Sequence, residues 1–156
     1  MRNLFFVAFV IIFFTGEITL AAKPPQELIS ILIQKESSGN DYAEGDKYYK
    51  DGRLKPASEW SYGPLQIGPK CIVDYNKWHG TSYRPEDCKG NRELSIKIFV
   101  SYIDHYATEK RIGRTPTLLD MAGIWNGGPN GWRLKSTLAY RQDVEERILK
   151  SRRKES

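Results

Sequence analysis

The chain has 156 residues, with 24 lysine and arginine against 19 aspartate and glutamate residues, which gives a net charge of +5. This length is enough for one domain with a hydrophobic core and too short for two. A basic protein meets anionic surfaces such as cell walls, acidic glycans or nucleic acid. A nucleic-acid binder would gather its basic side chains on one helix face or between aromatic residues, and here they are scattered. We therefore expect no nucleic-acid partner.

The first 22 residues have the three parts of a secretory signal. Arg2 supplies a positive start, Leu4 to Phe14 form an unbroken apolar run, and small residues for cleavage lie at 19–22. A membrane anchor is the alternative, but the run is far shorter than the roughly twenty residues of a spanning helix. We expect a signal peptide at 1–22, one domain at 23–156 without stable membrane insertion, and a secreted or periplasmic (cell-envelope) location.

Hydrophobic spacing and turn residues predict an α+β fold that is mostly helical, with a small irregular β region and a long central helix. Pro24 and Pro25 open the first helix, which ends near Ser38. Residues 40–62 are polar and rich in turn residues, and Asp51-Gly52 is typical of a hairpin. The later helices are expected at residues 69–78, 92–111 and 117–125 and around Tyr140, Val144 and Ile148. The basic residues of 150–154 are expected to form a frayed, solvated tail.

Cys71 and Cys88 are the only cysteines, and a pair in an exported chain predicts one disulfide. A metal site is a poor competitor, because His79 and His105 are the only histidines and no metal-ligand spacing occurs. We expect no metal or cofactor, and interpret His105 as a surface or packing residue.

Glu36 stands where an amphipathic helix normally carries a hydrophobic residue. Ile29, Leu32 and Ile33 share its helix face, because spacings of three, four and seven residues fall on one side. A carboxylate among apolar neighbours loses hydration, so its pKa rises and it can hold a proton near neutral pH, as a general acid must. The alternative is a boundary glutamate that turns into water where Gly39 ends the helix.

A second signal is the segment 124–132, Ile-Trp-Asn-Gly-Gly-Pro-Asn-Gly-Trp. So many glycine, proline and asparagine residues predict a structured turn where the backbone closely approaches something. An ordinary helix connection is the alternative, but it needs no flanking tryptophans. Because aromatic faces stack on sugar rings and backbone amides can bind an acetamido group, the composition favours a carbohydrate site.

These segments together resemble the ordered motifs of the lysozyme superfamily. The matching residues are Glu36-Ser37-Ser38-Gly39, Gly63-Pro64-Leu65-Gln66-Ile67, Ile124 to Pro129, and Tyr140. They are similar to motifs of lytic transglycosylases and goose-type lysozymes, and the Asn-Gly-Gly-Pro form is most similar to the invertebrate-type (destabilase) lysozymes. The resemblance spans roughly residues 28–145.

The resemblance implies a lysozyme-like fold that cleaves the β-1,4 bond between N-acetylmuramic acid and N-acetylglucosamine of peptidoglycan or a related amino-sugar glycan. By motif position Glu36 is the expected catalytic acid, and Tyr140 would support the acid or the substrate. The expected substrate-binding residues are Tyr62, Gln66 and Ile67 of a strand through 63–67, and Asn126, Gly127, Gly128 and Pro129. We expect a monomer.

The second carboxylate of a hydrolase is left open by the sequence. Glycosidic hydrolysis usually employs two carboxylates, and the family position falls here at Pro56 or Ala57. The candidates are Asp46 and Glu59, with Asp51 ranked lower. The predicted function is a secreted muramidase; the alternatives are a lytic transglycosylase, in which one acid also serves as base, and a non-catalytic glycan-binding module.

Overall fold

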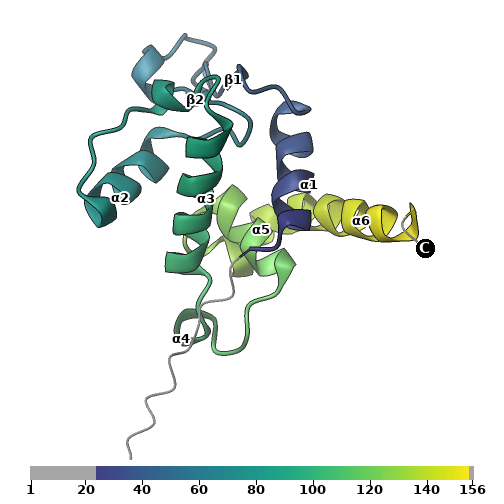
Figure 1. The fold of residues 1–156 in the computed structure, drawn as a ribbon. Coiled ribbons are helices and arrows are strands. Elements are labelled where there is room, and N and C mark those ends of the chain that lie inside the picture. The colour runs from purple at the N-terminus through teal and green to yellow at the C-terminus, as the bar shows by residue number, and fades with distance from the viewer. Residues whose placement is uncertain (1–23, 155–156) are drawn as a thin grey trace, which may run out of the picture.

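The computed structural model describes residues 24–154 and consists mostly of helices with one small two-stranded sheet in that part of the chain (Figure 1). The predicted signal segment lies outside the described residues. Within 24–154 no helix is both long and apolar enough to cross a bilayer. The helices and strands are α1 (Gln26–Ser37), β1 (Glu44–Gly45), β2 (Ser61–Tyr62), α2 (Pro69–His79), α3 (Arg92–Tyr106), α4 (Glu109–Ile112), α5 (Leu118–Gly127) and α6 (Leu138–Lys154). Short 3-10 helices are η1 (Ala57–Glu59), η2 (Pro85–Cys88), η3 (Gly131–Arg133) and η4 (Lys135–Thr137).

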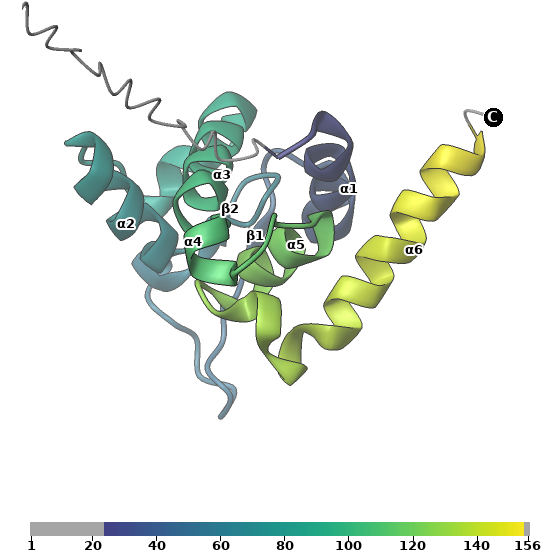
Figure 2. The same ribbon diagram turned by 90° about the horizontal axis from the view of Figure 1, so that it is seen from below.

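The core forms around α3, which packs against α2 on one side and α5 on the other. Ile98, Phe99 and Ile103 of α3 are fully buried, and Leu28 and Leu32 of α1 join the same cluster. Seen from below, α6 runs diagonally along one side of the molecule, and it contacts both α5 and α1 (Figure 2). The buried residues of α1 and α3 lie on the helix faces that the hydrophobic spacing of the sequence predicted to build the core.

The β region agrees with the expected small, irregular structure. β1 and β2 pair antiparallel, with Glu44 opposite Tyr62. The predicted hairpin at Asp51-Gly52 is confirmed by the bridge between Tyr48 and Leu54. Gly52 adopts a φ of 84°, which lets the chain reverse at the position where a side chain would be strained.

The central helix is shorter than predicted. It ends at Tyr106, because Ala107 leaves the helical conformation (φ −92°, ψ 66°) and Thr108 is extended. α4 then begins at Glu109, and Gly113 ends it with a φ of 82°. The break keeps Ala107 and Ile112 buried, so tertiary packing overrides the continuous apolar spacing.

The predicted frayed tail is wrong, because α6 continues as a helix to Lys154. The Arg152 guanidinium donates to both carboxylate oxygens of Glu27 on α1, at 3.0 and 2.9 Å. This pair fixes the end of α6 to the start of α1.

Gly131 is expected to be essential for the contact between α5 and η3. An added Cβ would lie 1.9 Å from the carbonyl oxygen of Gly123, so the two backbones must separate. We expect Gly131→Ala to lower the free energy of unfolding by about 3 kcal/mol, at the upper end of overpacking costs. The matched control is Gly113→Ala, where nothing lies within 4 Å and only the positive φ is strained, at about 1 kcal/mol. Denaturant unfolding measures both; equal losses would contradict the packing argument.

Candidate active site

Glu36 lies in the last turn of α1 and is held by α6. The Tyr140 hydroxyl donates a hydrogen bond to Oε1 of Glu36. One residue earlier, Lys35 pairs with Asp143 of α6, and its Nζ lies 4.5 Å from the Tyr140 ring centroid. Two neighbouring residues of α1 are thus tied to one face of α6. This arrangement fixes the carboxyl group of Glu36 and leaves Oε2 outside the Tyr140 bond.

Burial raises the pKa of Glu36, and this effect outweighs the hydrogen bond from Tyr140 and the charge of Lys35, which both lower it. The direction agrees with the sequence argument: a carboxyl group among apolar residues is disfavoured as an anion. Burial and the Glu36 charge raise the pKa of Tyr140, so its hydroxyl stays protonated and remains a donor. The pair therefore contains a carboxyl group suited to hold a proton and a fixed donor beside it.

Residues 63–67 form a tight turn and not the expected strand. Gly63 and Gln66 both have positive φ angles, 77° and 52°, and Ile67 returns to pair with Tyr62. An added Cβ at Gly63 would lie 2.4 Å from the carbonyl oxygen of Cys88, so only glycine fits there. The Gln66 amide donates to the Gly63 carbonyl at 3.0 Å and lies against Gly45 of β1. The turn thus positions Gln66 over the small sheet.

Two predicted binding residues prove to be packing residues. The Ile67 side chain is 0% exposed and that of Tyr62 is 3% exposed. The Tyr62 hydroxyl donates to the Ala57 carbonyl at 3.0 Å. The correction follows from the turn: because the chain reverses at 63–66, both flanking side chains point into the core, and only Gln66 of the three stays half-buried.

The glycine-rich segment 124–132 contains the end of α5, which runs to Gly127, and the structured turn that follows this helix, and close packing explains most of its glycines. Gly131 packs on the backbone of Gly123, and an added Cβ at Gly127 would lie 2.4 Å from Cγ2 of Thr137. Only Gly128 (φ 79°) has open space around it. Asn126 and Gly127 are exposed, while Gly128 and Pro129 are half-buried. Close packing therefore accounts for Gly127 and Gly131, and positions 126–129 stay accessible.

The two candidate second carboxylates bind partners other than Glu36. Asp46 is exposed, with a φ of 52°, and pairs with Lys55 at 2.8 Å. Glu59 is exposed and accepts a hydrogen bond from the Tyr49 hydroxyl at 2.9 Å. Asp51, ranked lower, pairs with Arg53 at 2.8 Å. These bonds all lie within the hairpin region.

Glu44 on β1 is a carboxylate that the sequence reasoning did not single out. Hydrogen bonds from Lys47 and Lys89, each 2.6 Å long, lower the pKa of Glu44 to about 2. It is therefore ionised at any physiological pH. Its two lysine bonds join β1 to the segment after η2, so we assign it a structural role.

Cys71 and Cys88 are free thiols in the structure, so the predicted disulfide is not formed there. Burial raises the pKa of both thiols, that of Cys88 to about 12, which leaves little thiolate for exchange. Among residues 24–154, no group of His, Cys, Asp or Glu side chains could hold a metal ion.

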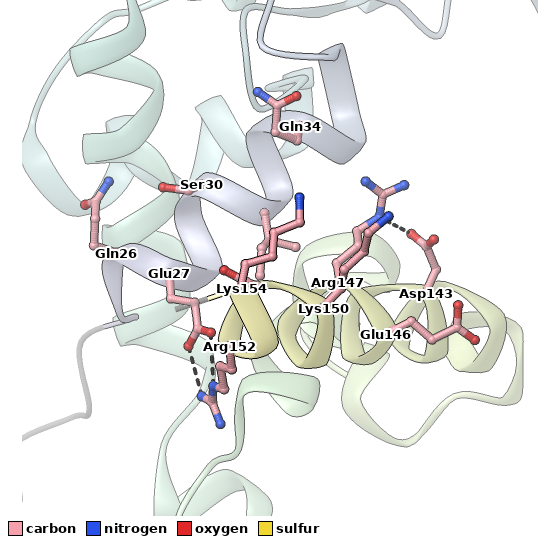
Figure 3. A pocket seen from close by; sticks show the side chains of 12 residues that line it. Gln26, Glu27, Ser30, Gln34, Asp143, Glu146, Arg147, Lys150, Arg152 and Lys154 are labelled. Atoms are coloured by element: carbon pink, nitrogen blue, oxygen red, sulfur yellow. Dashed lines mark hydrogen bonds and ion pairs between the residues drawn. The ribbon is translucent and has the colours of Figure 1, made fainter. Parts of the chain in front are cut away.

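A groove of about 920 Å³ lies elsewhere, between α1 and the C-terminal half of α6 (Figure 3). Its walls are mostly charged, and Glu27 of α1 pairs across it with Arg152 of α6. None of the sequence-predicted site residues lines it. The groove is therefore separate from the Glu36 and Tyr140 pair, although Asp143 borders both.

No protein-family profile matches the chain, and no characterised protein matches its sequence. Among solved structures, it is similar to a chain in the crystal structure of Aeromonas hydrophila PliI in complex with Meretrix lusoria lysozyme. The TM-score is 0.59 at 20% identity, and the likeness covers 78% of this chain and 88% of that chain. At this identity the likeness shows a shared fold alone.

Proposed function

We propose that this chain is a secreted enzyme of lysozyme-like fold that cleaves the β-1,4 bond between N-acetylmuramic acid and N-acetylglucosamine in peptidoglycan. The observation that carries the proposal is the carboxyl group of Glu36, whose pKa burial raises and whose Oε1 accepts from Tyr140. A structural glutamate at a helix end would gain by turning into water, whereas this one is held by the Tyr140 hydroxyl of α6, and its neighbour Lys35 is tied to Asp143 of the same helix.

In this mechanism Glu36 gives its proton to the glycosidic oxygen while the bond from that oxygen to C1 breaks. The Tyr140 hydroxyl stabilises the carboxylate that remains. In hydrolysis, water adds to C1 and gives one proton to a carboxylate, either the second carboxylate or Glu36 itself, and a new reducing end forms. In transglycosylation, the 6-hydroxyl of the same muramic acid adds to C1 and returns its proton to Glu36, which gives a 1,6-anhydro end. Gln66 and Asn126 to Pro129 would bind the sugars on either side.

A second candidate is a protein that binds a lysozyme. It is favoured by the fold likeness to a chain of the Aeromonas hydrophila crystal structure, because that structure holds PliI in complex with a lysozyme. That function requires no buried acid, so the geometry at Glu36 favours cleavage. A glycan-binding module without activity is the third candidate, and the same argument ranks it lower.

Release of soluble amino sugars from purified, insoluble peptidoglycan tests the proposal. We expect the protein lacking residues 1–22 to release fragments in proportion to its concentration. Sedimentation with peptidoglycan but no release would support the glycan-binding module. A third outcome is that the protein neither releases fragments nor sediments with peptidoglycan, and binds Meretrix lusoria lysozyme saturably. This outcome would overturn the proposal in favour of a lysozyme-binding protein.

The second carboxylate is tested by amide substitutions in the hairpin region. For a two-carboxylate hydrolase we expect either Asp46→Asn or Glu59→Gln to lower the release rate at least about 10-fold and the other to be nearly silent. The matched control is Asp51→Asn, which removes a third hairpin carboxylate that also pairs locally. Full activity in both variants would contradict the hydrolase mechanism and favour the single-acid transglycosylase.

A further inference from the structure

Aromatic side chains of α2, α3 and α5 form a continuous series of ring contacts, and all of them except Tyr102 are at least partly exposed. The Trp78 ring stacks on His105 with centroids 4.0 Å apart and meets the edge of Tyr106 at 5.5 Å. Tyr106 contacts Tyr102 at 4.7 Å, and Tyr102 contacts Trp125 at 5.9 Å. We call these five residues the aromatic strip. Its members come from three helices, so it is a feature of the fold and not of one segment.

The aromatic strip ends at the turn assigned to sugar binding. Trp125 directly precedes Asn126 in the chain. Arg111 of α4 adds a second connection, because its guanidinium lies 5.2 Å from the Tyr106 ring centroid and donates to the Pro129 carbonyl at 3.4 Å. The strip and the turn are therefore parts of one surface.

Exposure and polarity distinguish the strip from ordinary core packing. Tyr102 is buried, but Trp78, Tyr106 and Trp125 are only partly buried and His105 is exposed. Polar groups lie along it: the Tyr106 hydroxyl donates to Asp74 at 2.9 Å, and Arg111 covers the same ring. Aromatic faces bind the apolar C–H faces of pyranose rings, while carboxylates and guanidinium groups bind their hydroxyl and acetamido groups.

We infer that the aromatic strip supplies further saccharide-binding positions, which extend the site from Asn126–Pro129 across α3 to Trp78 on α2. The ligand is the continuing amino-sugar chain of the substrate. The inference rests on the proposed function for the identity of that chain. It predicts that long glycan strands bind better than short ones, and that Trp78 and His105 provide the difference.

The test measures binding without turnover, in the Glu36→Gln background. The probes are peptidoglycan-derived oligosaccharides of four and of ten or more sugars, and the readout is the ratio of their dissociation constants from calorimetry. We expect Trp78→Ala to reduce the preference for the long strand about 10-fold, which is within the range of a lost aromatic stacking contact. His105→Ala is expected to act in the same direction. Tyr83→Ala, a partly exposed aromatic that contacts Tyr75 outside the strip, is the matched control.

Each outcome supports or overturns the inference. An unchanged ratio in folded Trp78→Ala, or equal loss for both lengths, would overturn it, because the strip would then only support the fold. Should Trp78→Ala fail to fold, His105→Ala and Tyr106→Phe measure the same ratio. Loss of binding to Meretrix lusoria lysozyme with unchanged glycan binding would identify a protein surface and also overturn it. If Trp78→Ala selectively loses binding of the long strand, but the unsubstituted protein cleaves no peptidoglycan, the saccharide-binding role of the aromatic strip is supported and the proposed enzymatic function is rejected.

Discussion

Glu36→Gln is expected to lower the release of soluble fragments from peptidoglycan by about 10²–10⁴-fold, the usual contribution of general acid catalysis. The substitution keeps the shape of the side chain and an oxygen that can accept from Tyr140. It removes only the proton that the mechanism transfers. Folding, measured by circular dichroism, and sedimentation with peptidoglycan should both stay close to those of the unsubstituted protein.

The matched control for this variant is Glu145→Gln, the same chemical change at an exposed position of α6. It should leave the rate unchanged. If Glu36→Gln released fragments as fast as the unsubstituted protein, Glu36 would not be the acid. A loss of rate accompanied by a loss of folding would be resolved with Glu36→Asp, which keeps the acid and shortens its reach.

Tyr140→Phe is the second substitution with a large expected effect, and it acts on the pH profile. The Tyr140 hydrogen bond lowers the pKa of Glu36, against the larger effect of burial. Its removal therefore raises that pKa. A general acid works only while protonated, and activity is lost as the pH rises through its pKa. We expect the alkaline limb of the rate profile to move to higher pH, and the maximal rate to fall about 10-fold because the carboxyl group loses its fixed position.

The control for the pH profile is Tyr42→Phe, which removes the hydroxyl of an exposed tyrosine. Its profile should match that of the unsubstituted protein. A shift of the alkaline limb to lower pH in Tyr140→Phe would contradict the assigned role, because the hydroxyl would then be stabilising the protonated acid. If the alkaline limb of Tyr140→Phe stays at the same pH, the ionisation of Glu36 does not determine that limb.

Much of the fold could be predicted because local patterns and tertiary packing agree. The helices expected at 117–125 and 69–78 begin where predicted, because Thr117 caps α5 through a reciprocal bond with Asp120 and Pro69 begins α2. The sequence patterns failed where tertiary packing determines the ends of the helices. The apolar spacing around Ala107 does not indicate a break, because the buried residues Ile103, Ala107 and Ile112 continue the apolar face of α3 across it. The end of α6 was missed because Arg152 bonds to Glu27, far away in the sequence.

One contact of the candidate site could be predicted from the sequence motifs. Glu36 and Tyr140 meet as their motif positions implied, although they are separated by 104 residues. Tyr62 and Ile67 were expected to line the site, but both are buried, because residues 63–66 form a turn where a strand was predicted. The aromatic strip was not predicted at all. Its signal was the four-residue spacing of Tyr102 and Tyr106, which is equally typical of a buried helix face.

The central claim is that Glu36 drives cleavage of the glycan backbone, and mass spectrometry of the fragments released from peptidoglycan tests it most directly. The protein and its Glu36→Gln variant are compared on the same preparation. We predict fragments cut between N-acetylmuramic acid and N-acetylglucosamine from the first and almost none from the second, with reducing ends for hydrolysis or anhydro ends for transglycosylation. Fragments with an intact sugar backbone, or equal amounts of cut fragments from both proteins, would contradict it.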